Sequence, residues 1–184
     1  PGRHCAINLS RSWDSPHTLD TITEAFGPRL RDLRIDQPGP GLWPWLARQT
    51  GINDMILTGK VLPAEFDHRF QVPTGCLMLA GGIPNSRQSV DLSAFTATGQ
   101  FTIIQRRHLR LHLNGVATKL VLNTLSADPG NGWESLRELT IIESKQDLAP
   151  LLAAAPAVDT LHLYWPIHAA NLLELLATRR WRAI

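Results

Sequence analysis

The sequence predicts an α/β repeat protein, with short strands stacked along one face and helices or loops returning along the other. A recurring apolar triplet, L-x-x-L-x-L, is clearest at residues 30–35 and 136–141. Alternation inside each triplet places the apolar pair on one side of a strand and the residue between them on the other side. Helical periodicity follows several of the triplets. A strand followed by a returning helix, repeated at a regular spacing, is the unit of a repeat architecture.

Strands are predicted at regular steps near both ends of the chain. In the first part the core positions follow one another by 26, 22 and 22 residues: Ile7, Leu33, Met55 and Leu77. In the last part the steps are 19 and 22 residues: Leu120, Leu139 and Leu161. Steps of this length leave room for a helix or an extended return between strands.

Four helices are predicted on the returning side. Ser15 and Pro16 form a typical helix start, and Gly27 ends the first helix. The second and third helices cover residues 42–46 and 148–152. The fourth runs from His168 to Arg180 and is so apolar that it needs a covering neighbour, either a further repeat or a partner.

The middle of the chain is crowded. Successive core positions there are 13, 11, 10 and 9 residues apart: Leu77, Val90, Phe101, Leu111 and Leu120. One explanation is a parallel stack with tight extended returns, as in a β-solenoid. The other is an antiparallel hairpin inserted in the ladder, which the Asn114-Gly115 dipeptide favours. Parallel neighbours need a crossover of about a dozen residues, so we expect a partly antiparallel, irregular β-rich middle.

The triplets resemble those of the leucine-rich-repeat family, and the resemblance covers nearly the whole chain. The family's asparagine or cysteine after the last leucine is replaced here: Pro38, Lys60, Gly82 and Pro166. The turns therefore need another source of hydrogen bonds. The resemblance implies one leucine-rich-repeat-like solenoid over residues 1–184. The chain starts Pro-Gly-Arg-His without an initiator methionine, so we expect this domain to be a piece of a longer protein.

Composition excludes several classes of function. Eighteen basic and sixteen acidic residues leave a net charge of +2, which does not favour nucleic-acid binding. Apolar runs are too short for a membrane span, so no membrane partner is expected. Cys5 and Cys76 fall on strands three repeats apart, too far for a disulfide. Two free thiols favour a reducing compartment.

A search for catalytic and metal-binding motifs predicts no enzyme, no metal and no cofactor. The chain has no G-x-S-x-G elbow, phosphate-binding loop, H-E-x-x-H or C-x-x-C. His108 and His112 lie on a predicted strand, where they would be roughly 13 Å apart and unable to share a metal. Asp67-His68 is interpreted as a loop, because no nucleophile is tied to it by spacing.

The residues between the core pairs predict a binding surface on the concave face of the solenoid. One column of them contains Asn8, Arg34, Ile56, Met78, Asp91, Thr102, His112, Val121, Thr140 and His162. A second column, two residues further along, includes Ile142 and ends at Tyr164. The mixture of apolar, charged and aromatic side chains is typical of a protein-binding surface. The predicted partner-binding residues are Arg34, Ile56, Met78, Asp91, His112, Val121, Thr140, His162 and Tyr164.

The sequence therefore favours a protein–protein interaction module, with self-association through the C-terminal helix as a further expectation. The resemblance, with an excess of arginine over lysine that indicates a GC-rich bacterial genome, implies the recognition part of a secreted bacterial effector acting in the host cytosol. One alternative is a β-solenoid enzyme acting on polysaccharide, but the central columns offer only Asp36 and Asp91 as carboxylates. Another is the sensor segment of a signalling ATPase.

Overall fold

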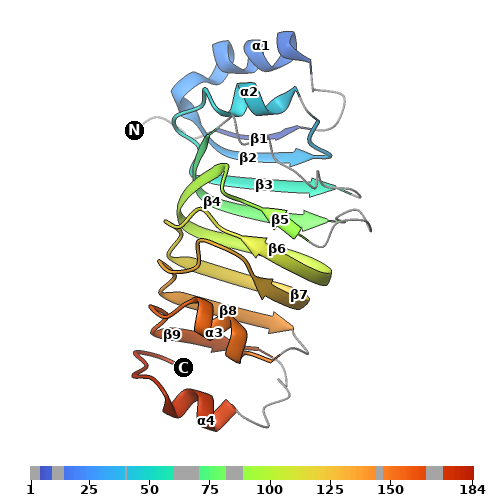
Figure 1. The fold of residues 1–184 in the computed structure, drawn as a ribbon. Coiled ribbons are helices and arrows are strands. Elements are labelled where there is room, and N and C mark those ends of the chain that lie inside the picture. The colour runs from blue at the N-terminus through green and yellow to red at the C-terminus, as the bar shows by residue number, and fades with distance from the viewer. Residues whose placement is uncertain are drawn as a thin grey trace.

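The chain folds as an α/β structure around one curled, parallel β-sheet. The computed structural model describes residues 5–9, 15–39, 41–59, 71–81, 89–143, 147–164 and 172–184. Nine strands in these segments form a single sheet, in the order β1-β2-β3-β4-β6-β7-β8-β9 with β5 beside β6 (Figure 1). The strands are β1 (Cys5–Leu9), β2 (Leu30–Asp36), β3 (Asp54–Gly59), β4 (Val72–Gly81), β5 (Ser89–Asp91), β6 (Phe95–His112), β7 (Lys119–Pro129), β8 (Glu138–Glu143) and β9 (Thr160–Leu163).

The register of the sheet stacks the apolar triplets as the sequence predicts. From β2 to β9 one row of paired core residues runs Leu33, Met55, Leu77, Phe101, Leu120, Leu139 and Leu161. Each is at most 1% exposed, and all belong to one hydrophobic cluster. Burial of this row holds the register, because a slip by one residue would turn every leucine toward solvent.

Few helices accompany the sheet in the described segments. They are α1 (Pro16–Phe26), the single 3₁₀ turn η2 (Gly27–Arg29), α2 (Leu42–Leu46), α3 (Ala149–Ala154) and α4 (Leu172–Ala177). Ser15 caps α1 as predicted, since its hydroxyl accepts the Thr18 backbone N–H at 3.3 Å, and Gly27 ends the helix at a φ of 42°. The described part of the fourth helix is shorter than the prediction, and residues 168–171 lie outside the described segments.

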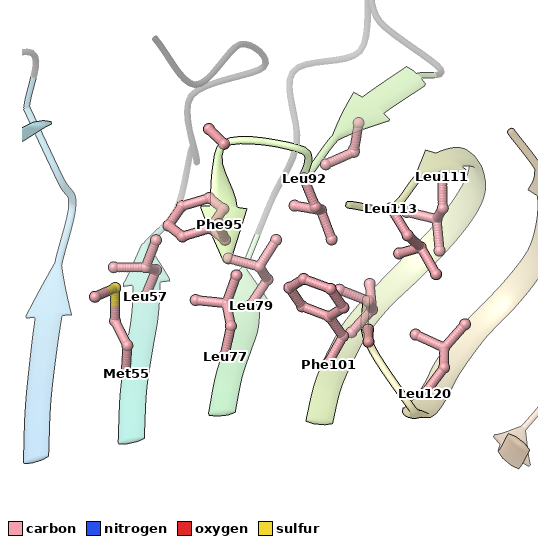
Figure 2. Close-up of a cluster of buried hydrophobic side chains, with 14 of the residues drawn as sticks. Met55, Leu57, Leu77, Leu79, Leu92, Phe95, Phe101, Leu111, Leu113 and Leu120 are labelled. Carbon is pink, nitrogen blue, oxygen red and sulfur yellow. The ribbon is translucent and has the colours of Figure 1, made fainter. Parts of the chain in front are cut away.

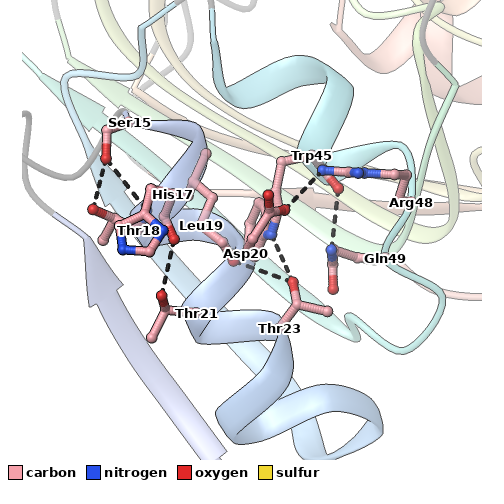
Figure 3. A network of polar contacts seen from close by, with 10 residues as sticks. All are labelled: Ser15, His17, Thr18, Leu19, Asp20, Thr21, Thr23, Trp45, Arg48 and Gln49. Carbon is pink, nitrogen blue, oxygen red and sulfur yellow. Dashed lines mark hydrogen bonds and ion pairs between the residues drawn. The ribbon is translucent and has the colours of Figure 1, made fainter.

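Polar contacts join α1 to α2 near the N-terminal end of the sheet. The indole N–H of Trp45, a residue only 1% exposed, donates to Thr23 Oγ1 at 2.8 Å (Figure 3). Arg48 reaches Asp20 across the same pair of helices at 3.2 Å. A buried indole needs such a partner, so Thr23 lets the large tryptophan ring enter the core without an unsatisfied donor.

All described strands of the crowded middle are parallel, and the predicted antiparallel hairpin is wrong. Phe101 and Leu111 lie on one long strand, β6, so their spacing of ten residues is not a step between neighbours. A register shift between Gln105 and His108 divides β6 into two parts. We call the parallel stack formed by β1, β2, β3, β4, the first part of β6, the start of β7, β8 and β9 the main ladder. The first part of β6 lies in this ladder between β4 and β7. The second part of β6 pairs with β5 through Val90 and Leu111. We call β5 and the later parts of β6 and β7 the second row.

The Asn114-Gly115 dipeptide forms a turn between two parallel strands instead of a hairpin. Asn114 Oδ1 accepts the backbone N–H groups of Val116 and Ala117 at 3.0 and 3.1 Å. The Asn114 side chain also donates to the Phe95 carbonyl. These contacts let residues 113–118 carry the chain from the second row back to the start of β7.

The hydrophobic core fills the space between the main ladder and the returning segments. Figure 2 shows Leu77 and Leu79 of β4 facing Leu92, which follows β5, and Phe95, the first residue of β6. These four residues are at most 1% exposed. The outward side of the main ladder is thus left free of the core, and the candidate site lies there.

At the C-terminal end, residues 182–183 add to the edge of the sheet. Ala183 forms a parallel bridge with Thr160, and its carbonyl accepts the Leu161 backbone N–H at 3.1 Å. None of the helices among the described residues has the length and apolar character needed to span a membrane.

Candidate functional site

The outward side chains of the main ladder form a continuous column, which we call the central column. Parallel pairing aligns its members in chain order: Asn8, Arg34, Ile56, Met78, Thr102, Val121, Thr140 and His162. Neighbouring strands in a sheet lie about 4.8 Å apart, so these side chains are adjacent. Six of the nine predicted partner-binding residues stand in this column: Arg34, Ile56, Met78, Val121, Thr140 and His162.

Asp91 and His112 do not belong to the central column, which corrects their prediction. They pair with each other on β5 and β6, in the second row. The error arises because the core pairs Val90/Leu92 and Leu111/Leu113 have the same alternation as the main rungs. Tyr164, the ninth predicted residue, follows β9 and donates its backbone N–H to the Ile141 carbonyl at 2.9 Å. It lies at the edge of the main ladder and its side chain is exposed.

A second outward column precedes the central one by two residues on each strand, and the sequence reasoning missed it. This leading column contains Asp32, Asp54, Cys76, Gln100, Lys119, Glu138 and Thr160. The signal was present, because these residues continue the period of two backward from the central column. The prediction stopped at the first leucine of each strand and so left them out.

Polar side chains meet where the two columns cross β6 to β9. Glu138 Oε1 lies 2.6 Å from Lys119 Nζ and 3.6 Å from His162 Nε2. Next to them, Gln100 Nε2 donates to Thr102 Oγ1 at 2.7 Å. Glu138 is the most enclosed of the three ionisable groups, with 26% of its side chain exposed. One carboxylate therefore holds a cation on one neighbouring strand and an imidazole on the other.

Two adjoining hollows lie over this polar cluster, and together we call them the groove. The first, of about 410 Å³, is lined by Gln100, Lys119, Val121, Glu138, Thr140, Ile142, His162 and Tyr164. The second, of about 590 Å³, is lined by Cys76, Gly99, Gln100, Thr118, Lys119, Arg137, Glu138, Asp159, Thr160 and Arg182. They share Gln100, Lys119 and Glu138. The groove thus has an apolar floor beside Tyr164 and a charged end beside Arg137 and Arg182.

Cys76 is the one thiol at the groove, and its surroundings keep it protonated. Burial raises the pKa of the Cys76 thiol above its ordinary value, and the nearby Asp54 carboxylate raises the pKa further. Lys119 acts in the opposite direction but less strongly. A raised pKa lowers the thiolate fraction at neutral pH, so this cysteine is a poor nucleophile. As predicted, Cys5 and Cys76 are both free.

The described residues contain no group of three His, Cys, Asp or Glu side chains that could hold a metal ion. His108 and His112 each have separate partners: His112 Nδ1 accepts the Asn131 backbone N–H at 3.3 Å, whereas His108 lies between Ser126 and Asp128. Asp67-His68 lies outside the described segments.

The chain matches no protein-family model, no curated protein and no solved structure.

Proposed function

We propose that the chain is a leucine-rich-repeat-like solenoid that binds another protein on the outward face of its main ladder. The spacing of the paired core rungs supports the repeat assignment. Successive rungs from Leu33 through Phe101 to Leu161 are separated by 22, 22, 24, 19, 19 and 22 residues. This range is narrow enough for one strand and one return per repeat.

The groove is the observation that carries the binding proposal. It is open along the sheet, so it suits an extended polypeptide better than an enclosed small molecule. Val121 and Ile142 offer apolar contact, and Tyr164 adds a large exposed ring. Lys119, Glu138 and His162 would fix the orientation of a bound polypeptide through charge and hydrogen bonds. Interfaces are typically built from such aliphatic and aromatic contacts with a polar rim.

This face works by binding and not by catalysis in our proposal. Its thiol is held protonated, and Glu138 is already engaged by Lys119 and His162. We further propose that the partner is met in a reducing compartment such as the cytosol of a host cell, because the two cysteines are free.

Selection from a displayed library of random peptides tests the proposal without a known partner. Enriched peptides should bind the purified chain saturably in fluorescence anisotropy. Val121→Glu places a charge on the apolar floor of the groove and should weaken binding about tenfold or more, which corresponds to ~1.4 kcal/mol. His162→Ala should weaken the binding of the same peptides.

Val116→Glu is the matched control, since Val116 is an exposed valine on the turn before β7 and outside the groove. This variant should bind like the unmodified chain. Equal affinity of the Val121→Glu and Val116→Glu variants for every selected peptide would refute binding at the groove.

A further inference from the structure

The second row carries a polar arrangement that lies apart from the groove. Ser126 and Asp128 are two residues apart on β7, so their side chains project from the same side of the strand. His108 of β6 is the register partner of Ser126. These three residues are separated by 18 and 20 positions in the sequence, so a search for local motifs does not detect them.

The histidine ring bridges the hydroxyl and the carboxylate. His108 Nδ1 lies 2.5 Å from Ser126 Oγ, and His108 Nε2 lies 3.0 Å from Asp128 Oδ2. An ionised carboxylate only accepts hydrogen bonds, so Nε2 carries the proton when His108 is neutral. Nδ1 then holds a lone pair toward Ser126 and accepts the hydroxyl proton. This is the order of groups that activates a serine nucleophile: hydroxyl, base and orienting carboxylate.

We propose that Ser126 is an activated nucleophile that accepts acyl groups from carboxylic esters, with His108 as general base and Asp128 as the residue that positions His108. This activity goes beyond the proposed binding function and departs from the sequence expectation of no enzyme. The arrangement is accessible to a reactant, since 44% of the His108 side chain and 60% of the Asp128 side chain are exposed.

The chemistry balances within the relay. Ser126 Oγ attacks the ester carbonyl carbon and forms a new C–O bond while its proton passes to His108 Nδ1. The bond from the carbonyl carbon to the leaving oxygen breaks, and that oxygen takes the proton from His108. Asp128 stabilises the imidazolium in between. Water then attacks the acyl-serine by the same route, which releases the carboxylic acid and restores the Ser126 hydroxyl.

Acetylation by p-nitrophenyl acetate tests the proposal on the whole chain. Release of p-nitrophenol gives the rate, and peptide mapping by mass spectrometry gives the acetylated residue. Ser126 should be the serine that is modified fastest. General-base catalysis contributes roughly 10²–10⁴-fold, so His108→Ala should slow acetylation of Ser126 by about that factor. Asp128→Asn should slow it in the same direction.

Two variants in the same row serve as controls. His112→Ala removes the neighbouring outward imidazole of β6, and Ser89→Ala removes an exposed hydroxyl of β5. Both should leave the acetylation of Ser126 unchanged. The unmodified chain decides the question even if a relay variant fails to fold. Acetylation of Ser126 no faster than that of Ser89, or acetylation confined to lysines, would overturn the proposal and leave the three residues as a tether between strands.

Discussion

Leu139 is enclosed by the strands on both sides, since it pairs with Leu120 of β7 and Leu161 of β9 and is fully buried. Leu139→Ala should open a cavity between rungs and lower the free energy of unfolding by roughly 2 to 5 kcal/mol. Chemical denaturation measures the loss. Leu125→Ala on the neighbouring strand β7, where Leu125 is exposed, should change stability far less. A loss below about 1 kcal/mol for Leu139→Ala would mean that it is not an interior rung.

Gln105 sits at the register shift of β6 and is only 3% exposed. Its Nε2 has no hydrogen-bond partner among the residues that the structure describes. A buried donor without a partner costs about 1 to 3 kcal/mol. Gln105→Leu keeps the size of the side chain and should therefore raise the melting temperature. A clear fall would show that the amide supports the bend in β6 through a contact of its oxygen.

The Cys76 thiol responds to two neighbours of opposite sign. Asp54 raises its pKa, so Asp54→Asn should lower the pKa and speed alkylation by iodoacetamide at neutral pH. Lys119 lowers the pKa, so Lys119→Gln should raise it and slow the same reaction. Burial is the largest cause and persists in both variants. Rates measured across a pH series give each pKa, and a shift of equal sign in both variants would contradict this account.

Two glycines in the turns that follow the second row both have a positive φ, but a side chain would collide with the backbone at only one of them. Comparing their alanine variants therefore distinguishes the cost of backbone strain from the cost of a steric collision. Gly132 has a φ of 83°, and a β carbon there would collide with the carbonyl of Leu113. Gly115 has a φ of 78°, but a β carbon there meets nothing within 4 Å. Both alanine variants pay the strain of a positive φ, about 1 to 3 kcal/mol. Thermal unfolding should show a larger loss for Gly132→Ala, whereas equal losses would mean that the turn yields to the added methyl group.

The strands of the main ladder could be predicted because each carries its own signal. Alternation of apolar and polar residues around Leu33, Leu77 and Leu139 identifies a strand and its inward side without reference to any other part of the chain. The middle could not be resolved in this way. Nothing in the local pattern says that the eighteen residues of β6 form one strand that bends at Gln105, so its two core pairs were interpreted as separate strands.

The candidate site was predicted in part for the same reason. Val121, Thr140 and His162 follow from alternation within their own strands. The contact between Lys119 and Glu138 depends on the pairing of β7 with β8, and Asp91 and His112 depend on which row their strands join. Contacts that depend on how two strands pair cannot be predicted from a pattern within either strand. The contact between Ser126 and His108, which lie on neighbouring strands, is an example.

At the scale of the whole molecule, the C-terminal end leaves apolar surface uncovered. Leu173 of α4 is 83% exposed. Ile184, which follows the bridging residue Ala183, is also exposed. We expect the chain to self-associate through this end, with an apparent mass that rises with concentration in light scattering. Leu173→Glu should make the chain monodisperse without changing its melting temperature, because the side chain is not part of the core.

Leu125→Glu is the matched control for self-association, since Leu125 is an exposed leucine on β7, which β8 and β9 separate from the C-terminal edge of the sheet (Figure 1). It should leave the association intact. A monomer at every concentration, unaffected by Leu173→Glu, would mean that α4 already closes the domain.

The order of the strands has a mechanical consequence. Among the described residues, each main-ladder strand pairs with the strands before and after it in the sheet, and β6 also pairs with β5, which directly precedes it in the chain. No described strand therefore joins two distant parts of the chain. Tension applied to the two termini would therefore act on one terminal strand at a time. Each detachment would release the residues between neighbouring rungs, from 19 between Phe101 and Leu120 to 24 between Leu77 and Phe101. Such a molecule lengthens in small successive steps, like a stack unpeeled from its ends, and a single global rupture is not required.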